Sequence, residues 1–157
     1  MEFKKVVQNL YRGSRMSADA DYQLLSDNDI DFVLNLERGY FEFLHGELNT
    51  EFEKCVRFNL YPIHLQLGDI APPSIKELEA VVGFIQMTQN NGFRVFVHCL
   101  HGVDRTGMSI AAFRIKACGW SYEKALEEML SFGFHKLPYT YLGWTKRLKE
   151  FAELKRG

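Results

Sequence analysis

A cysteine and an arginine with five residues between them are the centre of the chemistry that this sequence predicts. Cys99 ends a β-branched and aromatic run and a helical pattern covers 108–118, so Cys99 and Arg105 belong to a strand-to-helix turn. The backbone N–H groups of such a turn can converge on an anion, which the positive end of the helix dipole also attracts. Gly102 and Gly107 allow the unusual dihedral angles and close approach that this needs. The turn is therefore a predicted oxyanion site.

The cysteine can serve as the nucleophile of this site. A free thiol has a pKa of about 8.5, but a helix N-terminus and nearby cations can bring it to roughly 3.5–7.5, which would make Cys99 a thiolate. The Arg105 guanidinium can hold two oxygens of a phosphate, and the Thr106 hydroxyl can assist the sulfur as a leaving group. In the alternative, Cys99 is a core residue and Arg105 forms a surface ion pair. That alternative leaves the glycines and the threonine without a role.

The order His98-Cys99, five residues, then Arg105-Thr106-Gly107 resembles the signature of the cysteine-dependent phosphatases, the protein-tyrosine and dual-specificity phosphatase superfamily. The resemblance implies a phosphomonoester hydrolase that forms a phosphocysteine intermediate and needs no metal or other cofactor. Cys99 is then the nucleophile, and the implied phosphate-binding residues are Leu100, His101, Gly102, Val103, Asp104 and Arg105. Weaker similarity at residues 10–14 and 137–148 extends the resemblance over nearly the whole chain.

A phosphate ester also needs a proton donor for its leaving oxygen, and Asp69 is the candidate general acid. Asp69 is the one carboxylate in the proline-containing loop 64–73, and its Asp-x-x-Pro-Pro context resembles the acid loop of small atypical dual-specificity phosphatases. Two alternatives stay open. Asp69 could stabilise the dipole of the following helix, or Asp104 within the phosphate loop could be the acid.

Four cationic side chains are candidates for the rim of the pocket: Arg12, Arg15, Arg38 and Lys136. The ordinary alternative is that these side chains are solvated. For the first two, an ion pair with Asp19 or Asp21 is a further alternative.

The resemblance leaves the substrate open. A shallow pocket with a cationic rim suits a highly anionic small molecule, so inositol polyphosphate, as in the protein-tyrosine-phosphatase-like phytases, is the preferred prediction, with phosphoprotein second. His101 also occurs in the RNA 5′-phosphatase branch, whereas Asp104-Arg105 resembles inositide-directed members, which usually carry lysine where this chain has Val103. Nucleic acid is disfavoured because the net charge is −1 and no basic tract is present. A phosphate-binding module without turnover is the alternative from another class.

Length and composition favour a single catalytic domain covering residues 1–157, because the chain is 46% hydrophobic and its 157 residues are close to the commonest domain size of ~100–150 residues. The three cysteines show no disulfide or metal spacing, which indicates a reducing compartment. No segment reads as a membrane span or a signal peptide, so a cytoplasmic location is expected, although a chain with its leader removed would look the same. Oligomeric state is not predictable.

Strands and helices alternate along the chain, which is typical of an α/β layered sheet. Strands are expected at 3–12, 30–36, 56–63 and 95–97, and helices at 18–28, 41–54, 75–89, 108–118, 121–130 and 141–154. Ser74 and Glu77 form a predicted capping box before the third of these helices. The predicted fold is therefore α/β, with a central, mostly parallel sheet of about four to five strands flanked by helices, as in the dual-specificity phosphatases.

Overall fold

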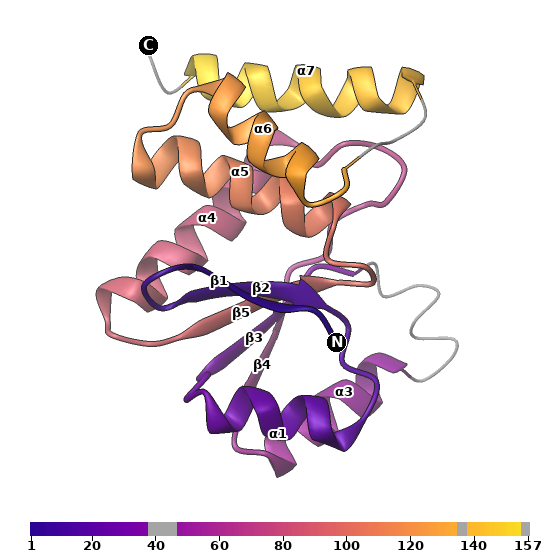
Figure 1. Ribbon diagram of the computed structural model, residues 1–157, viewed down its shortest axis with the longest axis vertical. Helices are drawn as coiled ribbons and strands as arrows, with labels where there is room; N and C mark the ends of the chain where they lie inside the picture. The colour runs from indigo at the N-terminus through magenta and orange to yellow at the C-terminus, as the bar shows by residue number, and fades with distance from the viewer. Residues whose placement is uncertain (38–46, 135–137, 155–157) are drawn as a thin grey trace.

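A five-stranded sheet forms the middle of the computed structural model, which describes residues 1–37, 47–134 and 138–154 (Figure 1). The strand order is β1–β2–β5–β3–β4, with only β1 and β2 antiparallel. The strands are β1 (Phe3–Val7), β2 (Leu10–Ser14), β3 (Phe32–Asn35), β4 (Tyr61–His64) and β5 (Val95–Cys99). This arrangement confirms the predicted α/β fold with a mostly parallel sheet.

Helices cover both faces of the sheet. α1 and α3 lie on one face, α4 and α5 on the other, and α6 and α7 pack on the outer side of α5 (Figure 1). The helices are α1 (Asp19–Asp27), α3 (Glu47–Arg57), α4 (Ile75–Asn90), α5 (Asp104–Cys118), α6 (Tyr122–Ser131) and α7 (Pro138–Leu154). Within residues 1–37, 47–134 and 138–154, none of these helices is long and apolar enough to cross a membrane.

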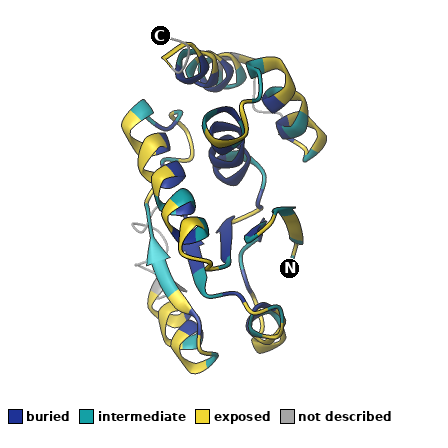
Figure 2. Ribbon diagram, turned by 90° about the vertical axis from the view of Figure 1, so that its left-hand side faces the viewer, coloured by how far each residue is buried: buried dark blue, intermediate teal, exposed yellow. Residues whose placement is uncertain are grey.

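The central strand β5 is buried along its whole length, between two hydrophobic cores (Figure 2). Because side chains alternate along a strand, Val95, Val97 and Cys99 join the core beneath α4, α5 and α7, whereas Phe96 joins the core beneath α1 and α3. His98 follows the same alternation and contacts Glu51 of α3. The last two residues of β5 therefore face opposite sides of the sheet.

Several predicted boundaries differ from the structure. The segment 56–63 was expected to be a strand, but α3 continues to Arg57, a turn with Asn59 at φ 60° follows, and β4 covers only Tyr61–His64. The apolar alternation of this segment does not become one face of a strand, because Val56 is exposed on α3 and Leu60 is buried in the turn before β4. α5 begins four residues before the predicted start, and residues 41–46 of the predicted helix 41–54 lie outside the described residues.

Candidate active site

The loop between β5 and α5 is the turn in which the sequence predicts an oxyanion site. Residues 100–103 connect Cys99, the last residue of β5, to Asp104, the first residue of α5. Gly102 has a φ of 72°, and a Cβ atom at this position would lie 2.4 Å from the carbonyl oxygen of Gly13 in β2. Only glycine fits there, because the left-handed conformation and the neighbouring backbone both exclude a side chain. The loop is thus packed tightly between the start of α5 and the end of β2.

Cys99 and Thr106 are joined by a hydrogen bond within this loop and the first turn of α5. Thr106 Oγ1 donates to Cys99 Sγ at 3.1 Å, and Cys99 is only 3% exposed. Because Thr106 lies in the first turn of α5, the sulfur lies near the positive end of that helix dipole. A hydroxyl donor and a helix N-terminus both favour the thiolate form of a cysteine.

Arg105 lies beside the loop with a buried guanidinium, and the residue is 5% exposed. Within the described residues its Nε atom makes no hydrogen bond, and Asp69 Oδ1 lies 3.7 Å from it. Buried donors are normally hydrogen-bonded, so this donor suits an oxyanion. The Asp69 side chain is 62% exposed. The structure therefore brings Asp69 and Arg105 together although 36 positions separate them by number.

The loop that carries Asp69 is held by the last helix. Trp144 Nε1 of α7 donates to the carbonyl of Ile70 at 3.0 Å, and Arg147 Nη1 donates to the carbonyl of Pro73 at 2.8 Å. On its other side, the loop is attached to the sheet through Leu67, whose N–H donates to the carbonyl of Leu36. These contacts give the loop a defined place next to Arg105, and sequence analysis did not anticipate them.

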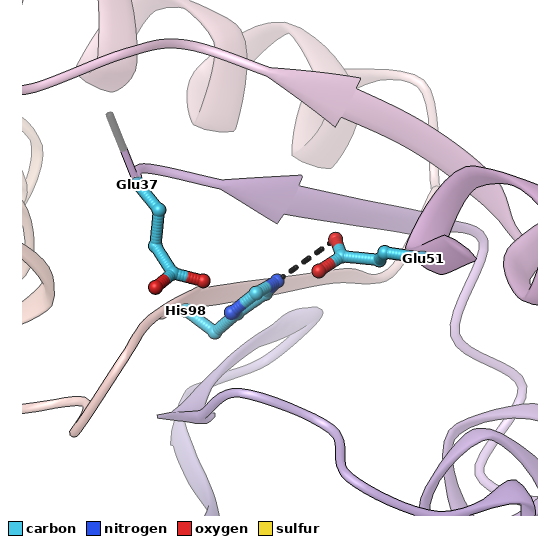
Figure 3. Close-up of side chains that lie close together, drawn as sticks. All are labelled: Glu37, Glu51 and His98. Carbon is cyan, nitrogen blue, oxygen red and sulfur yellow. Dashed lines mark hydrogen bonds and ion pairs between the residues drawn. The ribbon is translucent and has the colours of Figure 1, made fainter. Parts of the chain in front are cut away.

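A polar network lies beneath the loop, on the α3 side of β5 (Figure 3). His98 Nε2 lies 3.1 Å from Glu51 Oε1, and Asn35 Nδ2 donates to the other oxygen of Glu51 at 3.0 Å. His98 Nδ1 lies 3.3 Å from the carbonyl oxygen of Cys99. Arg15 donates to both carboxylate oxygens of Glu37, from Nε to Oε2 at 3.0 Å and from Nη2 to Oε1 at 2.5 Å. The network therefore connects α3 to the backbone of Cys99.

His98 is fully buried, and its charge depends on this network. Burial lowers the pKa of His98, but the Glu51 carboxylate and its hydrogen bond raise it, and the net effect is a raised pKa. The ligand atoms of His98, Glu51 and Glu37 lie within 4.8 Å of one another, a spacing that a metal ion could use. A cation would have to displace Arg15 from Glu37, so these residues are better described as a buried ion-pair network.

Arg12 lies behind the loop of residues 100–103. Its side chain is buried, with 3% of the residue exposed, and Nη2 donates to the carbonyl of Gly102 at 2.9 Å. Its guanidinium also stacks on the ring of Phe132, 3.8 Å from the centroid. Burial lowers the pKa of Arg12 to about 10, while the charges of Glu128 and Cys99 oppose this shift. Arg12 is therefore still a cation at neutral pH. It contacts the loop at a carbonyl oxygen, that of Gly102, and not at the backbone N–H groups that could bind an anion.

The remaining predicted site residues differ in burial and in the partners that they contact. The Arg15 side chain pairs with Glu37 rather than with either of the aspartates considered from the sequence. The backbone N–H of Arg15 donates to the carbonyl of Leu100 at 3.2 Å. In the loop itself, His101 is exposed and Val103 is partly buried. The other two rim candidates, Arg38 and Lys136, lie outside the described residues.

Sequence analysis missed the roles of Asn35 and Glu51 in the network. Their signal was present: Asn35 and His98 are polar residues in strands that are otherwise apolar, and such residues normally have buried partners. The partner of His98 is a residue 47 positions away on α3, which no local pattern indicates.

Comparisons with known proteins show what this chain is similar to. A family model described as "Polymorphic toxin system, DSP-PTPase phosphatase" matches residues 8–119. The chain is 31% identical over 124 residues to Protein phosphatase Slingshot homolog 3 of Mus musculus, which covers 78% of this chain and 17% of that protein. It is 38% identical over 79 residues to the dual specificity protein phosphatase TpbA of Pseudomonas aeruginosa, which covers 50% of this chain and 34% of that protein. The matched regions thus span about a third or less of these relatives.

Solved structures share the fold over nearly the whole chain. Tk-PTP in its active form has a TM-score of 0.78 and 23% identity, with 96% of each chain covered. PTPMT1 in complex with PI(5)P has a TM-score of 0.76 and 20% identity, with 98% of this chain and 96% of that chain covered. At these identities the structural comparison supports the fold alone.

Proposed function

The chain belongs to the DSP-PTPase phosphatase family, and on this premise we propose that residues 1–157 form one catalytic domain that hydrolyses phosphomonoesters through a phosphocysteine intermediate. The family match confirms the predicted membership of the cysteine-dependent phosphatase superfamily. The observation that carries the proposed mechanism is the meeting of four side chains at one loop. Thr106 donates to the Cys99 sulfur, while Asp69 lies 3.7 Å from the buried Arg105 guanidinium.

In the first step, the Cys99 sulfur bonds to phosphorus as the bond from phosphorus to the ester oxygen breaks. Arg105 and the backbone N–H groups of residues 100–105 hold the three other oxygens, on which negative charge develops. Asp69 gives its proton to the leaving oxygen, which would otherwise depart as an unstable alkoxide. The products of this step are a free alcohol and phosphocysteine.

In the second step, a water oxygen bonds to phosphorus and the phosphorus–sulfur bond breaks. The Asp69 carboxylate takes a proton from the water, and the electron pair of the broken bond returns to the Cys99 sulfur. The Thr106 hydroxyl stabilises the departing sulfur through the hydrogen bond already present in the structure. Inorganic phosphate is released, and the thiolate is restored.

Inositol polyphosphates are the substrate class that we propose first. Two cations lie at or behind the loop in addition to Arg105, namely Arg12 on β2 and Lys4 on β1. Such a group of cations favours a substrate that carries more than one phosphate.

Phosphoprotein is the second candidate, and the names of the relatives favour it. Slingshot homolog 3 is named as a protein phosphatase and TpbA as a dual specificity protein phosphatase. Comparison of kcat/KM for inositol hexakisphosphate and for phosphotyrosyl and phosphoseryl peptides separates the two candidates. A higher kcat/KM for a peptide would make phosphoprotein the preferred substrate class.

Turnover of p-nitrophenyl phosphate in the presence of a reductant tests the proposed reaction. We expect the wild-type chain to release p-nitrophenolate and the Cys99→Ser variant to release none. Cys118→Ser is the matched control, because Cys118 is exposed and ends α5, about 20 Å from the loop at 1.5 Å per helical residue. Absence of turnover in the wild type, together with retained vanadate binding, would instead identify a phosphate-binding module.

A further inference from the structure

A cavity of about 380 Å³ lies beside the phosphate loop, between that loop, the β1–β2 hairpin and the end of α6. This volume is within the range of small-molecule sites. Neither Cys99 nor Arg105, both in the described part of the chain, contributes to its wall. The wall residues that matter for its chemistry are Glu2, Lys4, Arg12, His101, Gly102 and Phe132.

Two cations of this wall stand directly opposite each other. Lys4 of β1 and Arg12 of β2 are register partners in the antiparallel hairpin, so their side chains share one face of the sheet. Both also lie over the ring of Phe132, with Lys4 Nζ 5.3 Å and Arg12 Cζ 3.8 Å from the ring centroid. Like charges directly opposite each other on two strands are destabilising. The aromatic ring offsets part of this repulsion, and an anion between the two cations would offset more.

Arg12 is a buried cation without a carboxylate partner in the described residues. The one hydrogen bond that its guanidinium makes within these residues goes to the neutral carbonyl of Gly102. The charge of Glu128 raises the pKa of Arg12, but no hydrogen bond joins the two side chains, which both belong to the described residues. Arg114 instead donates to both carboxylate oxygens of Glu128, at 3.1 and 2.8 Å. Buried charges in proteins are normally paired, because an isolated buried ion is costly. The guanidinium of Arg12, which lines the cavity, is therefore suited to an anionic partner from outside the chain.

We propose that this cavity binds a second phosphate group, held between Lys4 and Arg12 with His101 as a further donor at its edge. Glu2 contributes one negative charge to the wall, so the two cations leave a net positive charge without any contribution from His101. If the proposed phosphatase function holds, the loop then borders two phosphate sites, the catalytic site at Cys99 and the site in this cavity. Arg12 links them, because it lines the cavity and bonds to the Gly102 carbonyl.

The second phosphate can come from two sources, another phosphate of the bound substrate or a separate phosphate ion. The first source matches the inositol polyphosphates proposed above as substrates. Both sources require the same cations, so Lys4→Gln is the variant that tests the site. Lys5→Gln is the matched control, because Lys5 is the next residue on β1, has the same charge and points to the opposite face of the strand.

The first measurement blocks the catalytic loop with one equivalent of orthovanadate per chain, which the Cys99 sulfur at that loop binds in preference, so that the cavity stays free, and follows inorganic phosphate binding by ³¹P NMR. We expect phosphate to bind the vanadate-loaded wild type and the Lys5→Gln variant equally, and Lys4→Gln at least fivefold more weakly. Loss of all phosphate binding once vanadate is present would overturn the proposal. Equal affinities of the Lys4→Gln and Lys5→Gln variants would overturn it as well, because only the overall charge would then matter.

The second measurement compares kcat/KM for inositol hexakisphosphate with kcat/KM for p-nitrophenyl phosphate. If the substrate supplies the second phosphate, this ratio should fall at least fivefold in Lys4→Gln and stay unchanged in Lys5→Gln. An unchanged ratio in both, with phosphate binding lost in Lys4→Gln, identifies a separate phosphate ion as the ligand. Failure of the proposed phosphatase function is distinguishable, since the wild type would then turn over neither substrate while the NMR titration still reports on the cavity.

Discussion

Gly102→Ala should impair both the stability and the turnover of this protein, because position 102 has no room for a Cβ atom. The added Cβ would lie 2.4 Å from the carbonyl oxygen and 2.6 Å from the carbonyl carbon of Gly13. These neighbours are backbone atoms of β2, which pairs with β5 and cannot rotate away as a side chain would. Relief therefore requires the loop and β2 to move apart.

The size of the effect follows from this geometry. Alanine in the left-handed conformation costs about 1–2 kcal/mol, and an overpacked site typically adds about 1–3 kcal/mol. To restore ordinary contact, the loop must shift by about 1 Å, given that nonbonded atoms pack at roughly 3.5 Å. Since a misplacement of about 1 Å can cost about 10²-fold in rate, we expect kcat/KM to fall about 100-fold.

Gly119→Ala is the matched control for this prediction. Gly119 also has a positive φ, 69°, but a Cβ atom there meets nothing within 4 Å. Urea unfolding of Gly119→Ala should show only the conformational cost, and its p-nitrophenyl phosphate turnover should equal that of the wild type. Equal unfolding free energies for the two variants, or full turnover by Gly102→Ala, would refute the reasoning about the loop.

Three further predictions concern the reaction and the network beneath the loop. Asp69→Asn should lower kcat/KM about 10²–10⁴-fold for alkyl phosphates and less for p-nitrophenyl phosphate, whose leaving group needs no proton; equal losses would assign the acid elsewhere. Thr106→Ala should slow phosphocysteine breakdown, giving a burst of p-nitrophenolate in stopped-flow traces, and a trace without a burst would contradict the role of the hydroxyl. Glu51→Gln removes the carboxylate that raises the pKa of His98. The wild-type stability advantage over this variant should be complete below the unfolded histidine pKa of about 6.5 and should decrease as the pH rises through the raised folded pKa, as thermal unfolding at several pH values would show. An advantage that is independent of pH would exclude a protonated His98.

The placement of Cys99 and its immediate neighbours in one strand-to-helix turn was predictable because it depends on short-range order. Cys99, Arg105 and Thr106 lie within eight residues, and a strand followed by a helix places them at one turn whatever the rest of the chain does. The same holds for the start of α4, where Ser74 and Glu77 form the predicted capping box through reciprocal hydrogen bonds. Spacing along the chain is sufficient for such features, because the partners are joined by a few residues of regular backbone.

The surroundings of Cys99 depend on strand order and helix packing. Arg12 meets Gly102 because β2 pairs with β5, which joins residues 90 positions apart. Trp144 holds the loop that carries Asp69, and Glu51 reaches His98, because α7 and α3 pack on opposite sides of the sheet. Their residue types show only that these side chains are polar or aromatic. Which partner each one meets is settled by burial of the two cores, since that burial sets the order of the strands and the faces that the helices cover.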